Sequence, residues 1–332
     1  DALDSFHYAA DISTIGRIPE NYDMAKPGWS VFLGGIFSFF DFDNTLSYMQ
    51  LQKIVSILIS SLSVFPLYLL IRKFSERKYS LLGVLLFAVE PRLIQNSLLG
   101  NAEAIFIICI ITTILFFLST NKKIIYLSFV IAGLGTVFRP EGLFLFLSIT
   151  IVFFIKFRKD RLVFPKYLIG LILFILVITP IGLHQAEVGM YDPIILKPYT
   201  IVNSLFESNQ NVGENIKTQE VLENNSIGIG IETFSKYLVW VLIPMFIILT
   251  PPGFIIFLKN MKIEKISIMV IGICLSIPAF YVYSFPILET KYLYFLIPIF
   301  CIFSTISIKY FIEKISFRKI VFPICIMLIV LT

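Results

Sequence analysis

Long stretches of apolar residues, separated by short polar connections, recur along the whole of this 332-residue chain. Their lengths are close to the ~20 residues that an α-helix needs to cross the hydrocarbon layer of a bilayer. The pattern therefore predicts about ten spanning helices, near residues 48–71, 79–97, 103–119, 124–138, 142–155, 164–184, 236–258, 266–285, 292–312 and from about 319 onward.

Every second connection between these stretches is basic. Segments 72–78, 121–123, 156–166, 259–265 and 309–319 together hold 18 of the 27 Lys and Arg residues. Such loops lie in the cytoplasm by the positive-inside rule. Most Asp and Glu residues fall in the first 47 residues and in the other connections, including a long one at 185–235. The alternation predicts a multi-pass protein of the cell membrane in which residues 1–47 form an outer loop.

The composition agrees with this interpretation and excludes a soluble globular domain. Hydrophobic residues make up 57% of the chain and charged residues only 15%, whereas a soluble domain carries about 25% charged residues. The four cysteines lie inside apolar runs and have neither a disulfide framework nor a metal-site spacing. We expect membrane lipids among the partners and no nucleic acid.

The first 47 residues contain two amphipathic stretches, 3–14 and 28–40. We expect both to form juxtamembrane helices on the membrane surface, with Trp29 at the interface. Residues 1–332 are expected to form a single transmembrane domain. Because Asp1 already lies on the outer side and the last apolar run is too short to finish a crossing, we expect the sequence to be a fragment at both ends.

Polar residues at the outer helix mouths follow a recognisable order. The sequence carries Asp4 with Tyr8 four residues later, Lys26-Pro27, Asn101-Ala102-Glu103-Ala104, Arg139-Pro140-Glu141-Gly142 and Glu289-Thr290-Lys291-Tyr292. Because these motifs occur in this order and on this side of the membrane, the sequence resembles the GT-C membrane glycosyltransferases, particularly protein O-mannosyltransferases and lipid A aminoarabinose transferases. Two positions depart from the family pattern, since Gly28 replaces a second Pro and Glu103 replaces an Asp.

The resemblance implies an all-α, GT-C-like helical bundle and an inverting glycosyltransferase, of mannosyltransferase type. Such an enzyme moves a sugar from a polyprenyl-phosphate-linked donor to a protein or lipid acceptor on the non-cytoplasmic face. It needs a base for the acceptor hydroxyl and cations for the leaving phosphate. The Trp-Trp-Asp-Tyr-Gly sequence of oligosaccharyltransferases is missing from the chain, which weakens that related interpretation.

The resemblance also implies a role for each of these residues. Asp4 is the candidate base, ahead of Asp11 and Asp1, and Glu103 is the second catalytic candidate. Lys26, Arg139 and Lys291 are candidates for binding the donor phosphate. His7, Tyr8, Glu141 and Tyr292 are candidates for substrate binding. No cofactor is certain, and a divalent cation, Mg²⁺ or Mn²⁺, on Asp4 and Glu103 is one alternative.

Simpler interpretations stay open for most of these residues. Asp4 can be a solvated charge, Lys26 can snorkel at the interface, and His7 can be packing. Glu103 can be a partner for Arg139, and Arg139 can form a local ion pair with Glu141.

The main alternative function is a polytopic transporter or lipid flippase. Such proteins place ionisable residues near the bilayer midplane. Here the charges stay at the span ends, with only Lys53 near the beginning of a span, which favours surface chemistry. A non-catalytic scaffold also stays open.

Overall fold

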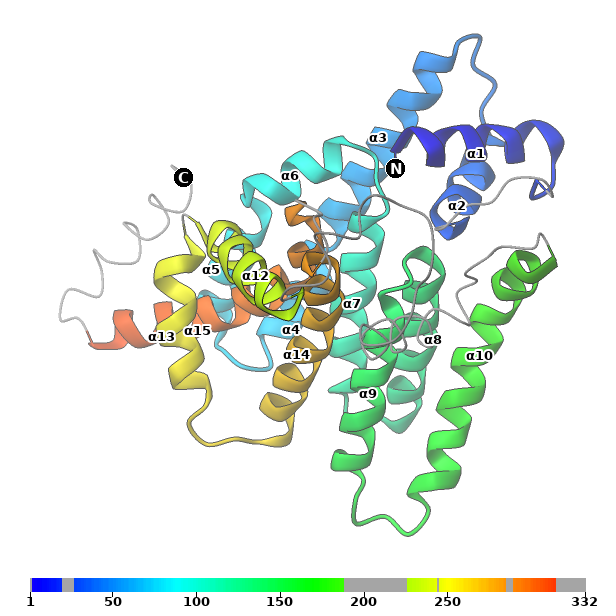
Figure 1. Cartoon of the computed structure of the whole chain (residues 1–332). Helices are drawn as coiled ribbons and strands as arrows, with labels where there is room; N and C mark the ends of the chain where they lie inside the picture. Colours follow the sequence, from blue (N-terminus) through cyan, green and yellow to red (C-terminus); the bar gives the residue numbers. More distant parts are fainter. Residues whose placement is uncertain (1, 20–26, 188–225, 244, 285–288, 315–332) are drawn as a thin grey trace.

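The computed structural model describes residues 2–19, 27–187, 226–243, 245–284 and 289–314 (Figure 1). Asp1, Lys26, most of the connection at 185–235 and the predicted last span lie outside the described residues. Every regular element within these ranges is helical. The elements are α1 Ala2–Ile15, α2 Pro27–Phe37, α3 Thr45–Leu62, α4 Val64–Ile71, α5 Arg77–Ala88, α6 Pro91–Leu98, α7 Glu103–Phe117, α8 Lys122–Phe138, α9 Gly142–Lys156, α10 Val163–Glu187, α12 Ser226–Leu242, α13 Phe246–Phe257, α14 Ile263–Tyr283, the 3₁₀ helix η2 Thr290–Leu296 and α15 Ile297–Lys314.

Four segments are long and apolar enough to cross a bilayer: Thr45–Ile71, Val163–Glu187, Ile263–Tyr283 and Thr290–Lys314. At 1.5 Å per residue they extend about 30–40 Å, which matches the hydrocarbon layer. Two bent helix pairs raise the number of candidate spans to six, and α7 and α9 are shorter apolar helices. The prediction of an all-α, multi-pass membrane protein is confirmed.

Two predicted spans are each divided into two helices. The stretch 79–97 is divided into α5 and α6, which meet at 49°, and the stretch 236–258 into α12 and α13, which meet at 105°. The first break follows from Pro91, whose ring lacks the N–H that a continuous helix needs. Glu90 caps α6 with its side chain, accepting a hydrogen bond from the backbone N–H of Arg92.

The same break holds a buried ion pair that the sequence pattern concealed. Glu90 is 3% exposed and accepts a hydrogen bond from Arg92 at 3.0 Å. Arg92 also donates to the carbonyl oxygens of Trp240 at 2.6 Å and Ile243 at 2.7 Å, at the end of α12. One arginine therefore joins the two breaks. Glu90 and Arg92 fall inside the predicted span 79–97, and the structure places them at the break between α5 and α6.

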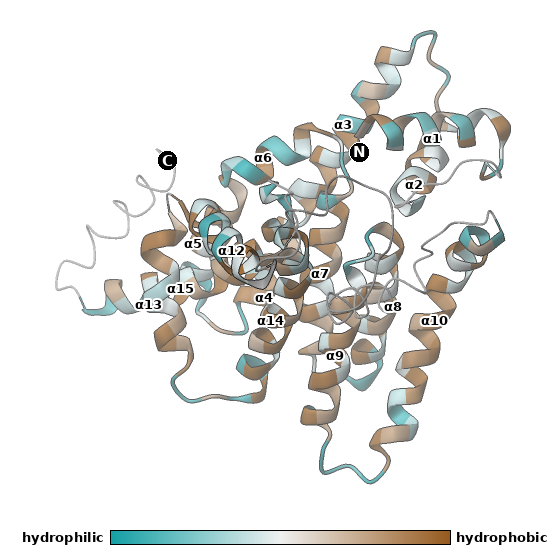
Figure 2. Ribbon diagram, in the orientation of Figure 1, coloured by the Kyte–Doolittle hydropathy of each residue, from teal (hydrophilic) through white to brown (hydrophobic). Residues whose placement is uncertain are grey.

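The apolar helices surround a core in which α7 and α15 are buried and α10 lies at the edge. Over an apolar stretch of 18 residues in each segment, 78% of the residues are buried in Thr290–Lys314 but only 17% in Val163–Glu187. Figure 2 shows hydrophobic residues along α9 and α10 and hydrophilic residues in the connection between them. That connection and the one between α13 and α14 lie at the end of the bundle opposite α1, α2 and α6 (Figure 1).

The first two predicted helices are present, but α2 packs against the bundle instead of lying exposed on a membrane surface. Trp29 is fully buried, and its indole N–H donates to the carbonyl oxygen of Gly100 at 2.9 Å. The prediction that Trp29 lies at the interface is therefore wrong. A Cβ at Gly28 would meet the carbonyl oxygen of Val137 at 2.3 Å, so only glycine permits this approach of α2 to the end of α8.

Candidate functional site

A buried cluster of three charged side chains lies where α7 and α9 begin and α8 ends. Glu103 opens α7, Arg139 follows the last residue of α8, and Glu141 precedes α9. The Arg139 guanidinium donates from Nη1 to Glu103 Oε1. It also donates to Glu141 from Nη2 at 2.8 Å and from Nε at 3.3 Å. The structure thus brings together residues that the sequence predicted at two separate helix mouths.

Arg139 is the centre of this cluster. Its side chain is 0% exposed, and the side chains of Glu103 and Glu141 are 1% and 13% exposed. Burial alone lowers the pKa of Arg139, but the carboxylates of Glu141 and Glu103 outweigh burial and raise that pKa. The aromatic rings of Phe295 and Tyr292 cover the guanidinium, with centroids at 4.9 Å and 5.9 Å. Arg139 therefore stays charged and oriented.

Glu103 keeps one carboxylate oxygen available. Its Oε2 atom is buried and has no hydrogen-bond partner among the described residues, and the same holds for the side-chain oxygen of Asn101. Leaving a buried carboxylate oxygen unpaired costs about 1–3 kcal/mol, a cost that a bound ligand with an N–H, an O–H or a cation removes. The free oxygen makes Glu103 a candidate binding or catalytic group.

The start of α1, which carries Asp4, is tied to the segment before Glu103 by one side chain. Gln52 on α3 donates to the carbonyl oxygen of Ala2 at 3.1 Å and to that of Gly100 at 2.9 Å. Gly100 has a φ of +74°, and a Cβ there would meet the Gln52 side chain at 2.9 Å. Asp4 follows Ala2 by two residues and Glu103 follows Gly100 by three, so Gln52 ties the backbone segments that carry these two residues to one junction.

The predicted residues of α1 differ in their exposure. Asp4 and His7 are exposed, whereas Tyr8 is buried. Buried Phe6 and Ala9 pack with Trp29 and with residues of α3 and α7. The packing holds α1 in place and turns the Asp4 carboxyl outward, as a group that receives a proton from a substrate requires.

Lys291 and Tyr292 reach the cluster on η2. Lys291 forms an ion pair with Glu289 at 2.6 Å, and its ammonium lies 5.8 Å from the centroid of the Tyr292 ring. Lys291 is 19% exposed. A cation is thus present beside the Arg139 cluster.

The described residues do not form a cation site of the usual kind. They contain no group of three or more His, Cys, Asp or Glu side chains that could hold a metal ion, whereas Mg²⁺ requires an octahedral set of oxygen ligands. The cation suggested for Asp4 and Glu103 stays a prediction.

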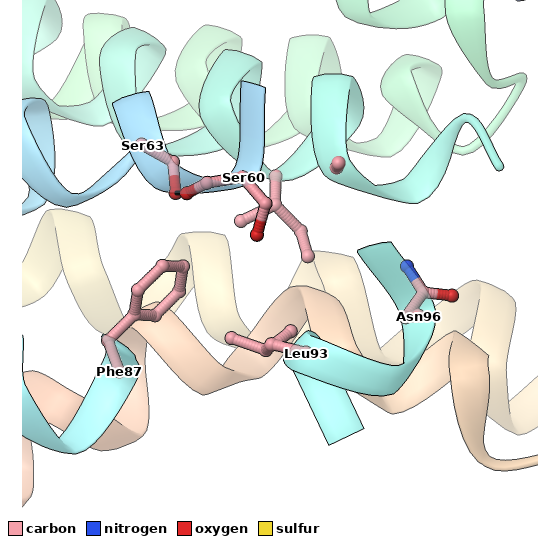
Figure 3. A pocket seen from close by; sticks show the side chains of 7 residues that line it. Ser60, Ser63, Phe87, Leu93 and Asn96 are labelled. Atoms are coloured by element: carbon pink, nitrogen blue, oxygen red, sulfur yellow. Dashed lines mark hydrogen bonds between the residues drawn. The ribbon is translucent and has the colours of Figure 1, made fainter. Parts of the chain in front are cut away.

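A small cavity lies beside Ala104, the residue that follows Glu103. Its volume is about 10 Å³, and its lining includes Ala104 with Ser60, Ser63 and Asn96 (Figure 3). That volume matches one water molecule. The cavity can hydrate polar side chains between α3, α6 and α7, but it is too small for a sugar.

Sequence reasoning missed Trp29, Gln52 and Gly100 as parts of the site. Gln52 lies near the start of the predicted span 48–71, where a buried amide needs a hydrogen-bond partner, and Gly100-Asn101 follows the short helix α6. Neither of these two sequence features predicts to which carbonyl oxygens Gln52 and Trp29 donate.

Comparison with known proteins gives a partial family match. Residues 45–184 match the family model of dolichyl-phosphate-mannose-protein mannosyltransferases. No curated protein sequence matches the chain.

Several solved membrane enzymes have the same fold. An oligosaccharyltransferase of Archaeoglobus fulgidus, solved with Zn and sulfate, superposes with a TM-score of 0.63 at 11% identity, over 98% of this chain and 47% of that one. The A. fulgidus enzyme AglB with an inhibitory peptide and a dolichol-phosphate gives 0.58 at 12% identity, over 94% and 46%. ArnT of Cupriavidus metallidurans, bound to undecaprenyl phosphate, gives 0.60 at 10% identity, over 94% and 55%. The chain spans about half the length of these proteins, and the sequence resemblance to GT-C enzymes is confirmed as a likeness of fold.

Proposed function

We propose that this chain, which has the fold of the GT-C membrane glycosyltransferases, transfers a sugar from a polyprenyl-phosphate-linked donor to a protein or lipid hydroxyl on the extracytoplasmic face. The observation that carries the proposal is the junction at Gln52 and Gly100, which ties exposed Asp4 and buried Glu103 to the same end of the bundle. AglB was solved with a dolichol-phosphate and ArnT with undecaprenyl phosphate, which supports this class of donor.

In the proposed reaction Asp4 takes the proton from the acceptor hydroxyl. The acceptor oxygen forms a bond to the anomeric carbon while the bond from that carbon to the phosphate oxygen breaks, with oxocarbenium character in between. The electron pair of the broken bond leaves with the polyprenyl phosphate. Attack opposite to the leaving group inverts the anomeric configuration.

Basic residues would stabilise the leaving phosphate. Lys291 is the described candidate, because its ammonium is partly exposed beside Tyr292. Lys26 is the second candidate and lies outside the described residues. Arg139 is occupied by two carboxylates in this structure, so we assign it the positioning of Glu103, the alternative that its ion pair favours over phosphate binding.

The remaining candidates would contact the sugar or the acceptor. The Glu103 oxygen without a partner can accept a hydrogen bond from a hydroxyl group. Exposed His7 on α1 and Glu141 and Tyr292 around Arg139 lie on the elements that surround the junction. Tyr8 is buried, so it would contact the substrate from the side of α1 that faces the protein.

A transporter or flippase is the second candidate function, because Glu90 and Arg92 occupy a helix break within a predicted span. Broken helices with ionisable residues are typical of transporters. In this structure, however, both groups bind protein partners.

The test uses the full-length protein in proteoliposomes with radiolabelled polyprenyl-phosphate sugars and membrane extract as the acceptor source. We expect label to leave the polyprenyl-phosphate fraction and appear on protein or lipid acceptor. Label that stays on the donor with every sugar offered, together with uptake of a soluble solute into the vesicles, would contradict transfer and favour transport.

A further inference from the structure

A second cavity lies between the basic connections and the ends of the helices that they join. Its volume is about 700 Å³, within the range of small-molecule sites. The connection after α4, the end of α7, the connection between α13 and α14, and the last turns of α15 all contribute to its lining. The sequence assigns these segments to the cytoplasmic face, so this cavity is remote from the Asp4 and Glu103 junction.

Lysine side chains give this cavity a positive lining. Lys73, Lys262, Lys265 and Lys309 line it, against the two carboxylates of Glu264 and Glu313. The four cations outnumber the two anions. An anionic ligand would therefore offset an excess positive charge.

Some of these lysines are held by the protein, and one is not. Lys73 donates to the carbonyl oxygen of Leu118 at 3.2 Å, and Lys265 donates to that of Phe257 at 2.9 Å. Lys309 forms an exposed ion pair with Glu76 at 3.3 Å. The Lys262 ammonium makes no hydrogen bond or ion pair with another described residue. The cavity thus combines fixed cations with one whose ammonium has no partner within the described part of the chain.

Apolar side chains complete the wall. Phe74, Ile256 and Ile306 line the cavity together with the lysines. A small hydrated ion makes no favourable contact with this apolar part of the wall, whereas a lipid carries hydrocarbon close to its phosphate group. Basic pockets between spanning helices on the cytoplasmic side are suited to anionic head groups.

We propose that this cavity binds the phosphate group of an anionic ligand on the cytoplasmic side, at a site separate from the transfer reaction. The phosphate would accept hydrogen bonds from the ammonium groups of Lys262 and Lys309. A membrane phospholipid and a free phosphorylated solute share this chemistry. The experiment below separates the two sources.

The full-length protein is purified and studied by native mass spectrometry with dioctanoyl phosphatidylglycerol, dioctanoyl phosphatidylcholine or inorganic phosphate. Lys262→Gln/Lys309→Gln removes two lining cations, and Lys123→Gln/Lys159→Gln removes the same charge from predicted cytoplasmic connections outside the cavity. Melting temperatures check that both variants fold. We expect binding of phosphatidylglycerol to the wild type, weakened at least about tenfold in the cavity variant and unchanged in the control.

Each outcome decides the proposal. Inorganic phosphate bound with the same dependence on Lys262 and Lys309, but without binding of phosphatidylglycerol, would support a soluble phosphorylated ligand. Equal binding of phosphatidylglycerol and phosphatidylcholine, or equal loss in the cavity variant and the control, would overturn the proposal. Because this readout is binding, its failure leaves the proposed transfer reaction unaffected.

Discussion

Asp4→Asn lowers sugar transfer by about 10²–10⁴-fold, the range that a general base contributes, while the protein keeps its yield and melting temperature. The amide has nearly the shape of the carboxylate but cannot take the acceptor proton. Asp4 is exposed on α1, where substitutions usually change the free energy of unfolding by no more than about 0.5 kcal/mol. The measurement is initial-rate transfer of radiolabelled sugar by purified wild type and variant.

The matched control for this variant is Asp11→Asn. Asp11 is also exposed and lies seven residues further along α1, so both substitutions remove one carboxylate from the same face of the same helix. We expect Asp11→Asn to keep transfer within about twofold of the wild type. Equal losses in the two variants would show a general effect of charge on α1, and full activity in Asp4→Asn would remove Asp4 as the base.

Arg139→Leu has the largest expected effect on stability. It leaves the carboxylates of Glu103 and Glu141 without their shared cation in a buried site, and breaking a buried pair in this way costs about 3–5 kcal/mol. We expect a large fall in the melting temperature in detergent, measured by the loss of monodisperse protein in size-exclusion chromatography after heating.

Two further variants separate this effect from a loss of charge. Arg158→Leu removes an exposed arginine from the connection after α9 and should change the melting temperature little, since surface substitutions are usually within about ±0.5 kcal/mol. Adding Glu103→Gln to Arg139→Leu should restore part of the lost stability, because it removes one uncompensated charge. A double variant less stable than Arg139→Leu would contradict the proposed pairing.

The apolar pattern predicted the positions of most helices, because burial in lipid needs runs of similar length wherever a helix crosses. It predicted one span each at 79–97 and 236–258, where the structure has two helices joined by a bend. At 79–97 the mean hydropathy stays high across Glu90-Pro91-Arg92, because the residues on both sides are apolar. The average therefore predicts one span. The hydrogen bonds of Arg92 to Trp240 and Ile243 join residues 148 and 151 positions apart, a separation that local periodicity does not contain.

The candidate site was predicted in its parts but not in its arrangement. Glu103 and Arg139 are visible in the sequence because each interrupts an apolar run at a helix mouth. Their ion pair connects residues 36 positions apart, and spacing alone left phosphate binding and pairing equally open for Arg139. Trp29 was assigned to the interface from its usual preference, whereas close packing at Gly28 draws it into the core.

The proposed transfer requires the Asp4 end of the bundle to face away from the cytoplasm, and labelling from one side of the membrane tests this orientation. In whole cells, a membrane-impermeant maleimide is applied to Asp43→Cys, in the connection before α3, and to Lys159→Cys, in the connection before α10. We expect Asp43→Cys to be labelled in intact cells and Lys159→Cys only after permeabilisation. Labelling of Lys159→Cys alone in intact cells would reverse the orientation and contradict the proposed extracytoplasmic transfer.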